Sequence, residues 1–320
     1  MSTRSSIILP ICISLGVCAG RVTLAQASGA VSVPVLVESK SGKIAYGLSA
    51  NDFQLKDNGI GQRVEMQDGT EERPLSLILV IQTGNGASSQ LGKIAHLGAL
   101  LDGLLTNSQD QAAVITFDSR PQLLQDFAKN SDDVSNSLAS ISAGKSGAAL
   151  FDAMHMAISS LRKAPSENRK VVVLISGDHD HGSYASDNAS LIHDVSLSDA
   201  SVYCLSFKPA RRGFVGKLGF VSPAAVFEDA MKRNSSEALA QLTGGEFYRF
   251  DSEWGFLDRV LEIANHINNR YILTFHPSNP EPGFHSLEVE VERSKTAVLS
   301  ARTVYWLAAS GPIGTGGGWQ

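Results

Sequence analysis

Short, uninterrupted apolar runs separated by segments of helical periodicity constrain this fold more than any other feature. The runs are residues 77–81, 112–115, 171–175 and 202–207. Strands covered by helices on both faces of a parallel sheet carry apolar residues at every position. Apolar residues between the runs recur at helical spacing, as at Leu150, Met154, Ile158 and Leu161. The pattern predicts an α/β fold with a doubly wound, mostly parallel sheet.

Both ends of the chain instead alternate apolar and polar residues, which is typical of half-exposed antiparallel strands. The N-terminal strand begins at Val31, and its Pro34 predicts a sheet edge or a bulge. The segment 53–64 predicts a β-hairpin whose second strand is centred on Val64. Further strands are expected at 271–275 and 287–291 and over about 298–306, the last as one strand. Since neither end can bury a sheet face alone, we expect the two sets to pair into one small antiparallel β domain.

The first 27 residues have the pattern of an export signal. Arg4 precedes an apolar stretch at 7–19, and Ala25-Gln26-Ala27 offers small residues for cleavage after Ala27. A lipid anchor at Cys18 is the less favoured alternative, since Val17 is bulky for a lipoprotein box. The expected location is periplasmic, cell-surface or extracellular, with no transmembrane segment in the mature chain.

The charge balance and the cysteines exclude some functions. With 27 Lys and Arg against 32 Asp and Glu, the formal net charge is −5, which disfavours nucleic acid as a partner. Cleavage would leave Cys204 as the sole cysteine, in an apolar run typical of a buried hydrophobic residue.

Several stretches carry motifs in a fixed order. Gly47–Gly59 contains Gly-Leu-x-x-x-Asp-Phe followed by Asp-Asn-Gly, and Gly147–Ala153 reads Gly-Ala-Ala-Leu-Phe-Asp-Ala. Leu239–Gly245 reads Leu-Ala-Gln-Leu-Thr-Gly-Gly, and Tyr271–Pro277 is followed by Phe284-His285 and an alternating strand. In this order the motifs resemble a family of secreted proteins with a von Willebrand factor type A (VWFA) related domain, abundant in acidobacteria.

The resemblance implies a binding site at the carboxyl edge of the sheet, where strand ends meet helix N-termini. Family members hold Mg²⁺ there in a metal-ion-dependent adhesion site (MIDAS), through Asp-x-Ser-x-Ser, a Thr and an Asp. Here residues 82–86 read Gln-Thr-Gly-Asn-Gly, Ala148 replaces the Thr, and the carboxylate of Asp178 is displaced by one residue. One displaced anion does not replace the full set of oxygen ligands, so we expect a degenerate MIDAS and no cofactor.

The resulting domain organisation is a signal peptide at 1–27, a β segment at 28–70, and a von Willebrand factor A-like domain at 71–270. A C-terminal β segment at 271–308 pairs with 28–70, and a flexible tail follows at 309–320.

Asp178-His179-Asp180-His181 offers an alternative metal site, because imidazole and carboxylate together suit Zn²⁺, Ni²⁺ or Mn²⁺. The competing interpretation is a loop whose aspartates form turns and cap helices, with Ser183 and Asp187 beginning the next helix.

The segment 209–231 is an insertion after the fifth parallel strand and carries Arg211 and Arg212. It is expected at the carboxyl edge, where its charge could receive an acidic partner group in place of a metal. A solvated surface loop is the alternative.

The sequence contains no nucleophile elbow, zinc-binding His-Glu-x-x-His, P-loop or dinucleotide motif. We therefore predict an exported, non-enzymatic protein that binds a protein partner, as an adhesion or scaffolding protein. Its candidate binding residues at the carboxyl edge are Gln82, Asn85, Ser88, Asp178, Arg211 and Arg212. A divalent-metal-binding protein or hydrolase using Asp178–His181 is one alternative function, and strand addition at the Glu288/Glu290/Glu292 strand is another.

Overall fold

The computed structural model describes residues 29–67, 73–94, 97–207, 223–293 and 296–308. Its central sheet, within these residues, has six strands in the order β10-β9-β8-β5-β6-β7. The strands are β5 (Leu75–Gln82), β6 (Gln111–Phe117), β7 (Pro121–Ala128), β8 (Arg169–Ser176), β9 (Ser201–Ser206) and β10 (Phe247–Arg249). All neighbours pair in parallel except β6 and β7. The predicted apolar runs are therefore the core of β5, β6, β8 and β9.

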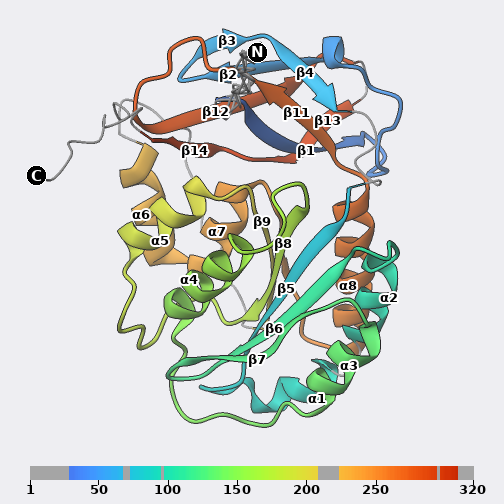
Figure 1. Cartoon of the computed structure of the whole chain (residues 1–320), viewed down its shortest axis with the longest axis vertical. Coiled ribbons are helices and arrows are strands. Elements are labelled where there is room, and N and C mark those ends of the chain that lie inside the picture. The colour runs from blue at the N-terminus through green and yellow to red at the C-terminus, as the bar shows by residue number, and fades with distance from the viewer. Residues whose placement is uncertain (1–28, 68–72, 95–96, 208–222, 294–295, 309–320) are drawn as a thin grey trace, which may run out of the picture.

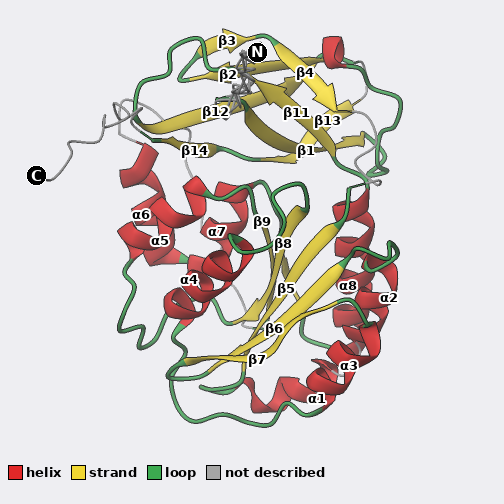
Figure 2. Ribbon diagram, viewed as in Figure 1, coloured by secondary structure: helices red, strands yellow, loops and turns green. Residues whose placement is uncertain are grey.

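Helices cover both faces of this sheet (Figure 2). One face packs against α4 (Leu150–Leu161), α5 (Asn188–Leu197), α6 (Pro223–Arg233) and α7 (Ser235–Thr243). The other face packs against α1 (Leu91–Ile94), α2 (Gly98–Leu104), α3 (Ser131–Ala139) and α8 (Glu253–Asn268). Along β5, Ile78 and Val80 join the first core, and Leu77 and Leu79 the second. Because both faces are covered, the strands are apolar at successive positions, and the predicted fold class is confirmed.

A second domain lies against one end of this α/β domain (Figure 1). It contains two antiparallel four-stranded sheets, in the orders β13-β1-β11-β4 and β14-β12-β2-β3 among the described residues. Its strands are β1 (Val31–Ser39), β2 (Phe53–Asp57), β3 (Ile60–Gln62), β4 (Val64–Gln67), β11 (Tyr271–Phe275), β12 (Gly283–Val291), β13 (Thr296–Ala301) and β14 (Val304–Leu307). A short 3-10 helix, η1 (Ala50–Asp52), precedes β2. Side chains from both ends of the chain form its core.

Some strand predictions were wrong in detail. The hairpin partner of β2 is β3, joined by Asn58 (φ 48°) and Gly59 (φ 79°), which gives the left-handed turn that fits a twisted hairpin. The strand at Val64, β4, pairs with β11 in the other sheet. The expected final strand is two strands, β13 and β14, which belong to different sheets.

Pro34 lies in an interior strand, yet its position accommodates a residue that has no backbone N–H. β1 pairs with β11 through residues 31–35 and with β13 through residues 35–39, so Pro34 has a paired strand on one side only. The register shifts between Leu36 and Val37. The missing N–H of proline is tolerated because no second ladder reaches this position.

Cys204 is free and 1% exposed, in agreement with its predicted packing role. Within the described residues, the helices lack the combination of length and hydrophobicity needed to cross a membrane.

A buried polar network joins the strands of the β domain. His285 Nδ1 lies 2.9 Å from Asp57 Oδ1, and its Nε2 lies 2.6 Å from the Glu281 carbonyl oxygen. The Tyr305 hydroxyl donates to Asp57 Oδ2 at 2.8 Å. His285 and Asp57 are 2% and 3% exposed, so the imidazole is needed to compensate the buried carboxylate.

We therefore expect His285→Ala to lower the free energy of unfolding by about 3 kcal/mol, because it leaves a buried carboxylate short of a partner. Urea unfolding measures the change. His276→Ala, at an exposed position of the same domain, serves as the matched control and should change stability by less than about 0.5 kcal/mol. Equal effects of the two substitutions would contradict the role given to the network.

Candidate functional site

The candidate site is the carboxyl edge of the central sheet, formed by the C-terminal ends of β5, β8, β9 and β10 and the loops that follow them. This edge lies at the end of the α/β domain farther from the β domain (Figure 1). Polar residues mark the strand ends, because the strands leave the apolar core there: Gln82 on β5, Asp178 after β8, Ser206 on β9 and Arg249 on β10.

Gln82 links two loops through its side-chain amide. Its Oε1 accepts a hydrogen bond from the Gly177 backbone N–H at 2.9 Å, and its Nε2 donates to the Gly84 carbonyl oxygen at 3.0 Å. The residue is 1% exposed. The amide therefore makes hydrogen bonds to two backbone groups inside the protein, at the position where the family resemblance implies a charged metal ligand.

The loop after β5 packs backbone against backbone. A Cβ atom at Gly84 would lie 2.5 Å from the carbonyl oxygens of both Gly147 and Lys145. A Cβ atom at Gly144 would lie 2.6 Å from Thr83 Oγ1. A serine hydroxyl at position 84 has no room, and position 82 presents a bonded amide. The residues present do not fit the octahedral oxygen set that Mg²⁺ requires.

Asp118 connects the loops that meet here, namely the loop after β5, the loop after β6 and residues 144–147, which we call the closed loop cluster. Its Oδ2 accepts from the Lys145 N–H at 2.8 Å and its Oδ1 from the Arg120 N–H at 3.2 Å. Burial alone raises the pKa of Asp118, but the backbone donors, with Ser119, outweigh it and leave the pKa below its ordinary value.

Asp178 points toward β9 and β10. The Ser206 hydroxyl donates to Asp178 Oδ1 at 2.5 Å, and Arg249 Nη2 lies 3.8 Å from Oδ2. The Arg249 guanidinium also stacks on Phe247, with Cζ 4.5 Å from the ring centroid. Burial raises the pKa of Glu237, and Arg249 partly offsets this. The structure thus groups Asp178 with Arg249 and Glu237, while Gln82 belongs to the loop cluster.

Sequence reasoning missed Arg249 and Glu237. Arg249 ends a three-residue strand, and Glu237 lies in the first turn of α7, so neither belongs to a recognisable motif. Their proximity depends on the pairing of β10 with β9, which local sequence does not encode.

The aspartates of the Asp178–His181 run diverge. Asp180 Oδ1 accepts from the Phe151 N–H at 3.1 Å and from the Ser183 hydroxyl at 2.5 Å, so it caps the start of α4. The rings of His179 and His181 are 6.4 Å apart between centroids. Among the described residues, no three His, Cys, Asp or Glu side chains are grouped to hold a metal ion.

The predicted start of the following helix was half right. Asp187 caps α5 by accepting from the Ser190 N–H at 2.8 Å. Ser183 instead accepts from the Asp152 N–H at 3.0 Å, and Asp152 in turn accepts from the backbone of residues 184–186. The loop after β8 is thereby fastened to the N-terminus of α4.

Asn85 and Ser88 are the exposed members of the predicted binding set. Asn85 has a φ of 48°, a left-handed conformation that asparagine tolerates, and Ser88 begins the exposed part of the 3-10 helix η3 (Ala87–Gln90). Arg211 and Arg212 lie outside the described residues.

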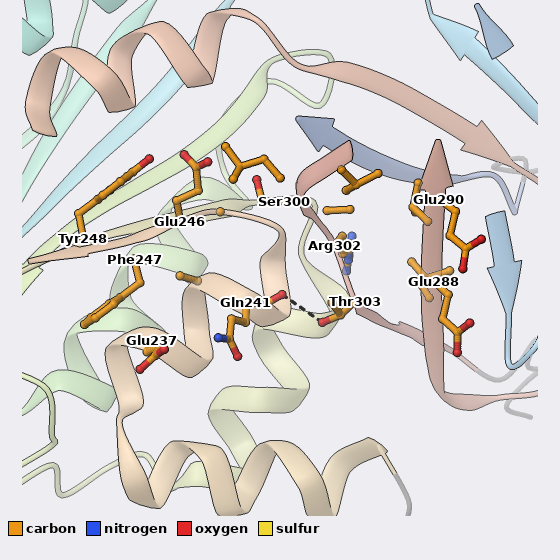
Figure 3. A pocket seen from close by; sticks show the side chains of 17 residues that line it. Glu237, Gln241, Glu246, Phe247, Tyr248, Glu288, Glu290, Ser300, Arg302 and Thr303 are labelled. Atoms are coloured by element: carbon orange, nitrogen blue, oxygen red, sulfur yellow. Dashed lines mark hydrogen bonds between the residues drawn. The ribbon is translucent and has the colours of Figure 1, made fainter. Parts of the chain in front are cut away.

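A groove of about 620 Å³ lies elsewhere, between α7 and β10 on one side and β12 and β13 on the other. Figure 3 shows Glu237 and Gln241 on α7, and Glu288 and Glu290 on β12, flanking Arg302 and Thr303. The strand singled out for strand addition therefore borders a hollow between the two domains. Arg302 donates to the carbonyl oxygens of Val304 and Ser196.

Comparison with known proteins finds a family match within the α/β domain. Residues 81–179 match the family model of the von Willebrand factor type A domain. No curated protein matches the chain. The matched segment runs from the end of β5 to His179 and includes the closed loop cluster and α4, so the similarity to that family lies in this part of the chain.

The solved structures to which the chain is similar have low sequence identity to it. An aerotolerance-related membrane protein of Bacteroides fragilis is 18% identical, with 61% of this chain and 98% of that chain covered and a TM-score of 0.45. BatB of Bacteroides thetaiotaomicron is 18% identical, with 60% and 98% covered and a TM-score of 0.44. Proximal thread matrix protein 1 of the mussel byssus, described with a zinc-occupied MIDAS motif, is 13% identical, with 65% and 49% covered and a TM-score of 0.46.

The close packing at Gly84 predicts that Gly84→Ala lowers the free energy of unfolding by about 2 kcal/mol, because the added Cβ meets backbone oxygens that cannot move independently. Gly92→Ala is the matched control, since no atom lies within 4 Å of its Cβ position and alanine favours helix α1. Chemical unfolding of both variants measures the difference. A neutral Gly84→Ala would show that the loop cluster is open.

The lowered pKa of Asp118 predicts a pH-dependent contribution to stability. Its carboxylate stabilises the folded state above its unfolded pKa of about 3.9, and this stabilisation is lost as the pH falls through the lower folded value. Asp118→Asn should therefore be less stable than the wild type at pH 7, and the difference should shrink between about pH 5 and pH 2. Urea midpoints across this range test the expectation, and a constant difference would contradict it.

Proposed function

We propose that this chain is an exported, non-enzymatic protein-binding protein, of adhesion or scaffolding type, whose carboxyl edge recognises a partner without a metal ion in the family position. The observation that carries the proposal is the closure of that position by Gln82 and Gly84. Recognition then depends on shape and hydrogen bonding at the rim, where no metal-bound water or carboxylate is required.

In the described loops, buried residues stabilise the structure and exposed residues are available for binding. Gln82 and Asp118 are committed to hydrogen bonds that fix the loops after β5 and β6. Asn85, in the loop after β5, and Ser88, in η3, are exposed and offer an amide and a hydroxyl. A rigid scaffold with exposed polar tips is suited to binding, because little side-chain and loop entropy is lost on association.

The alternative of a metal-dependent protein or hydrolase receives less support. Asp178 and Asp180 bond to opposite neighbours, β9 and α4, and both carboxylates have structural partners. A catalytic metal needs several convergent ligands and an open position, so the non-enzymatic function is preferred.

Metal independence is tested by thermal unfolding after EDTA treatment and with added Mg²⁺, Mn²⁺, Ca²⁺, Ni²⁺ or Zn²⁺. Binding to the native state raises the unfolding midpoint, so we expect no shift with any ion. A Mg²⁺ shift would contradict the closed site. A Zn²⁺ or Ni²⁺ shift that disappears in the His179→Ala/His181→Ala variant would instead support the alternative function.

Partner recognition is tested by placing bulk on the rim. Ser88→Trp should reduce, by at least about tenfold, the amount of specific partner captured from an envelope extract of the source cells, because it blocks a packed interface. Ser108→Trp, exposed before β6 at the opposite edge of the sheet, is the matched control. Equal capture by both variants would place recognition elsewhere.

A further inference from the structure

Each side of β12 is paired over only part of its length. On one side β14 pairs with residues 283–286, and on the other β2 pairs with residues 287–291. Among the described residues, no strand continues the line of β14 beside residues 288–291. This open half of the β12 edge borders the groove of about 620 Å³ between the two domains, whose other walls are β13, α7 and β10.

The backbone of Val289 is directed toward this opening. On the β2 side, the Glu292 N–H donates to the Asp52 carbonyl oxygen at 2.8 Å. On the β14 side, the Leu287 N–H donates to the Thr303 carbonyl oxygen at 2.8 Å. Successive residues of a strand direct their backbone groups to alternate sides, so Val289 shares the side of Leu287. Its N–H and carbonyl oxygen, which have no ladder partner in the described structure, can therefore pair with a further strand.

Apolar side chains lie along the same opening. Val289 and Val298 pack on the core of the β domain and remain partly exposed, and Leu299 is 41% exposed. Phe247 lines the opposite wall and is also partly exposed. The volume of the groove is in the range of about 300–1,000 Å³ that is typical of ligand-binding clefts. An extended segment in this groove can thus bury apolar side chains while its backbone pairs with β12.

The open edge also carries negative charge. Glu288 and Glu290 are exposed, and their carboxylates lie on the same side of β12 (Figure 3). On β2, Lys56 is paired with Glu288, with Nζ 3.9 Å from Oε2. Arg302, the one basic residue that lines the groove among those described, is 5% exposed and donates to two backbone carbonyl oxygens. A strand added on the open side is therefore favoured if it places Lys or Arg opposite the glutamates.

We propose that this groove binds an extended segment of a partner protein, which joins β12 as an antiparallel strand in line with β14. The segment alternates basic and apolar residues. Its Lys or Arg residues lie opposite Glu288 and Glu290, and the apolar residue between them lies opposite Val289 and packs toward Val298. The groove is separate from the carboxyl edge, so the two surfaces bind independently.

The test uses a fluorescein-labelled peptide, Gly-Thr-Lys-Val-Lys-Thr-Gly, titrated with the protein at constant ionic strength and followed by fluorescence polarisation. A peptide with Glu in place of both lysines is the matched control. We expect saturable binding of the Lys peptide and at least about tenfold weaker binding of the Glu peptide. Absence of binding by the Lys peptide would overturn the proposal and leave the glutamates the role of protecting an edge strand from aggregation.

N-methylation of the peptide backbone distinguishes strand pairing from charge attraction. In the proposed register, the valine of the peptide directs its N–H to β12, whereas the lysines direct theirs away. N-methylation of the valine should therefore weaken binding at least about tenfold, because it removes the donor and adds bulk at the pairing edge. N-methylation of the second lysine should change binding less than about twofold. Equal effects of the two methyl groups would contradict strand addition.

Glu290→Lys tests the charge from the side of the protein. It should weaken binding of the Lys peptide about fivefold and strengthen binding of the Glu peptide by a similar factor. Glu65→Lys, at an exposed position of the edge strand β4 in the other sheet, is the matched control and should change neither. Ser88→Trp should also leave peptide binding unchanged, which separates this groove from the carboxyl edge. Unaltered binding of both peptides by Glu290→Lys would contradict the proposal.

Sedimentation velocity distinguishes a partner protein from a second copy of this chain as the occupant. We expect the protein to sediment as a monomer at the concentrations of the titration, with the groove free to take up the peptide. A dimer that the Lys peptide dissociates would assign the groove to a second copy and overturn the proposed occupant.

Discussion

The loops at the carboxyl edge of the α/β domain are joined by one neutral side chain, at the position where the family resemblance implies a charged metal ligand. The Gln82 amide joins the loop after β5 to the loop after β8, and it does so with both of its polar atoms. A carboxylate at this position would need a cation to remain buried, whereas an amide is satisfied by two backbone groups. The glycine at position 84 then lets the neighbouring loops close on this point.

With these loops closed, the carboxylates of the loop after β8 have structural partners. Asp178 is drawn toward Ser206 and Arg249, and Asp180 caps α4, so the acidic loop after β8 is used for structure. Among the described residues of the carboxyl edge, short polar side chains such as Asn85 and Ser88 remain exposed. Under the proposed function, recognition at this surface depends on shape and hydrogen bonding and needs no metal ion.

The sequence was sufficient to predict the layers of the fold, but it was insufficient to predict the contacts between residues far apart in the chain. Apolar runs fixed the buried strands because covered parallel strands leave no polar face. The sequence did not reveal the break between β13 and β14. At Arg302 and Thr303 the chain passes from one sheet to the other, and the residue pattern does not mark this change. The departures from the family pattern at 82, 84 and 148 were visible in the sequence, but the Asp178–Arg249 contact depends on residues far apart in sequence.

The connectivity also determines how the molecule carries mechanical load. β1 and β14 both belong to the β domain, and the α/β domain is inserted between β4 and β11. Tension applied through β1 and β14 therefore passes between the two sheets of the sandwich and bypasses the inserted domain. The carboxyl edge can keep its shape under a pull that would strain a domain placed in series.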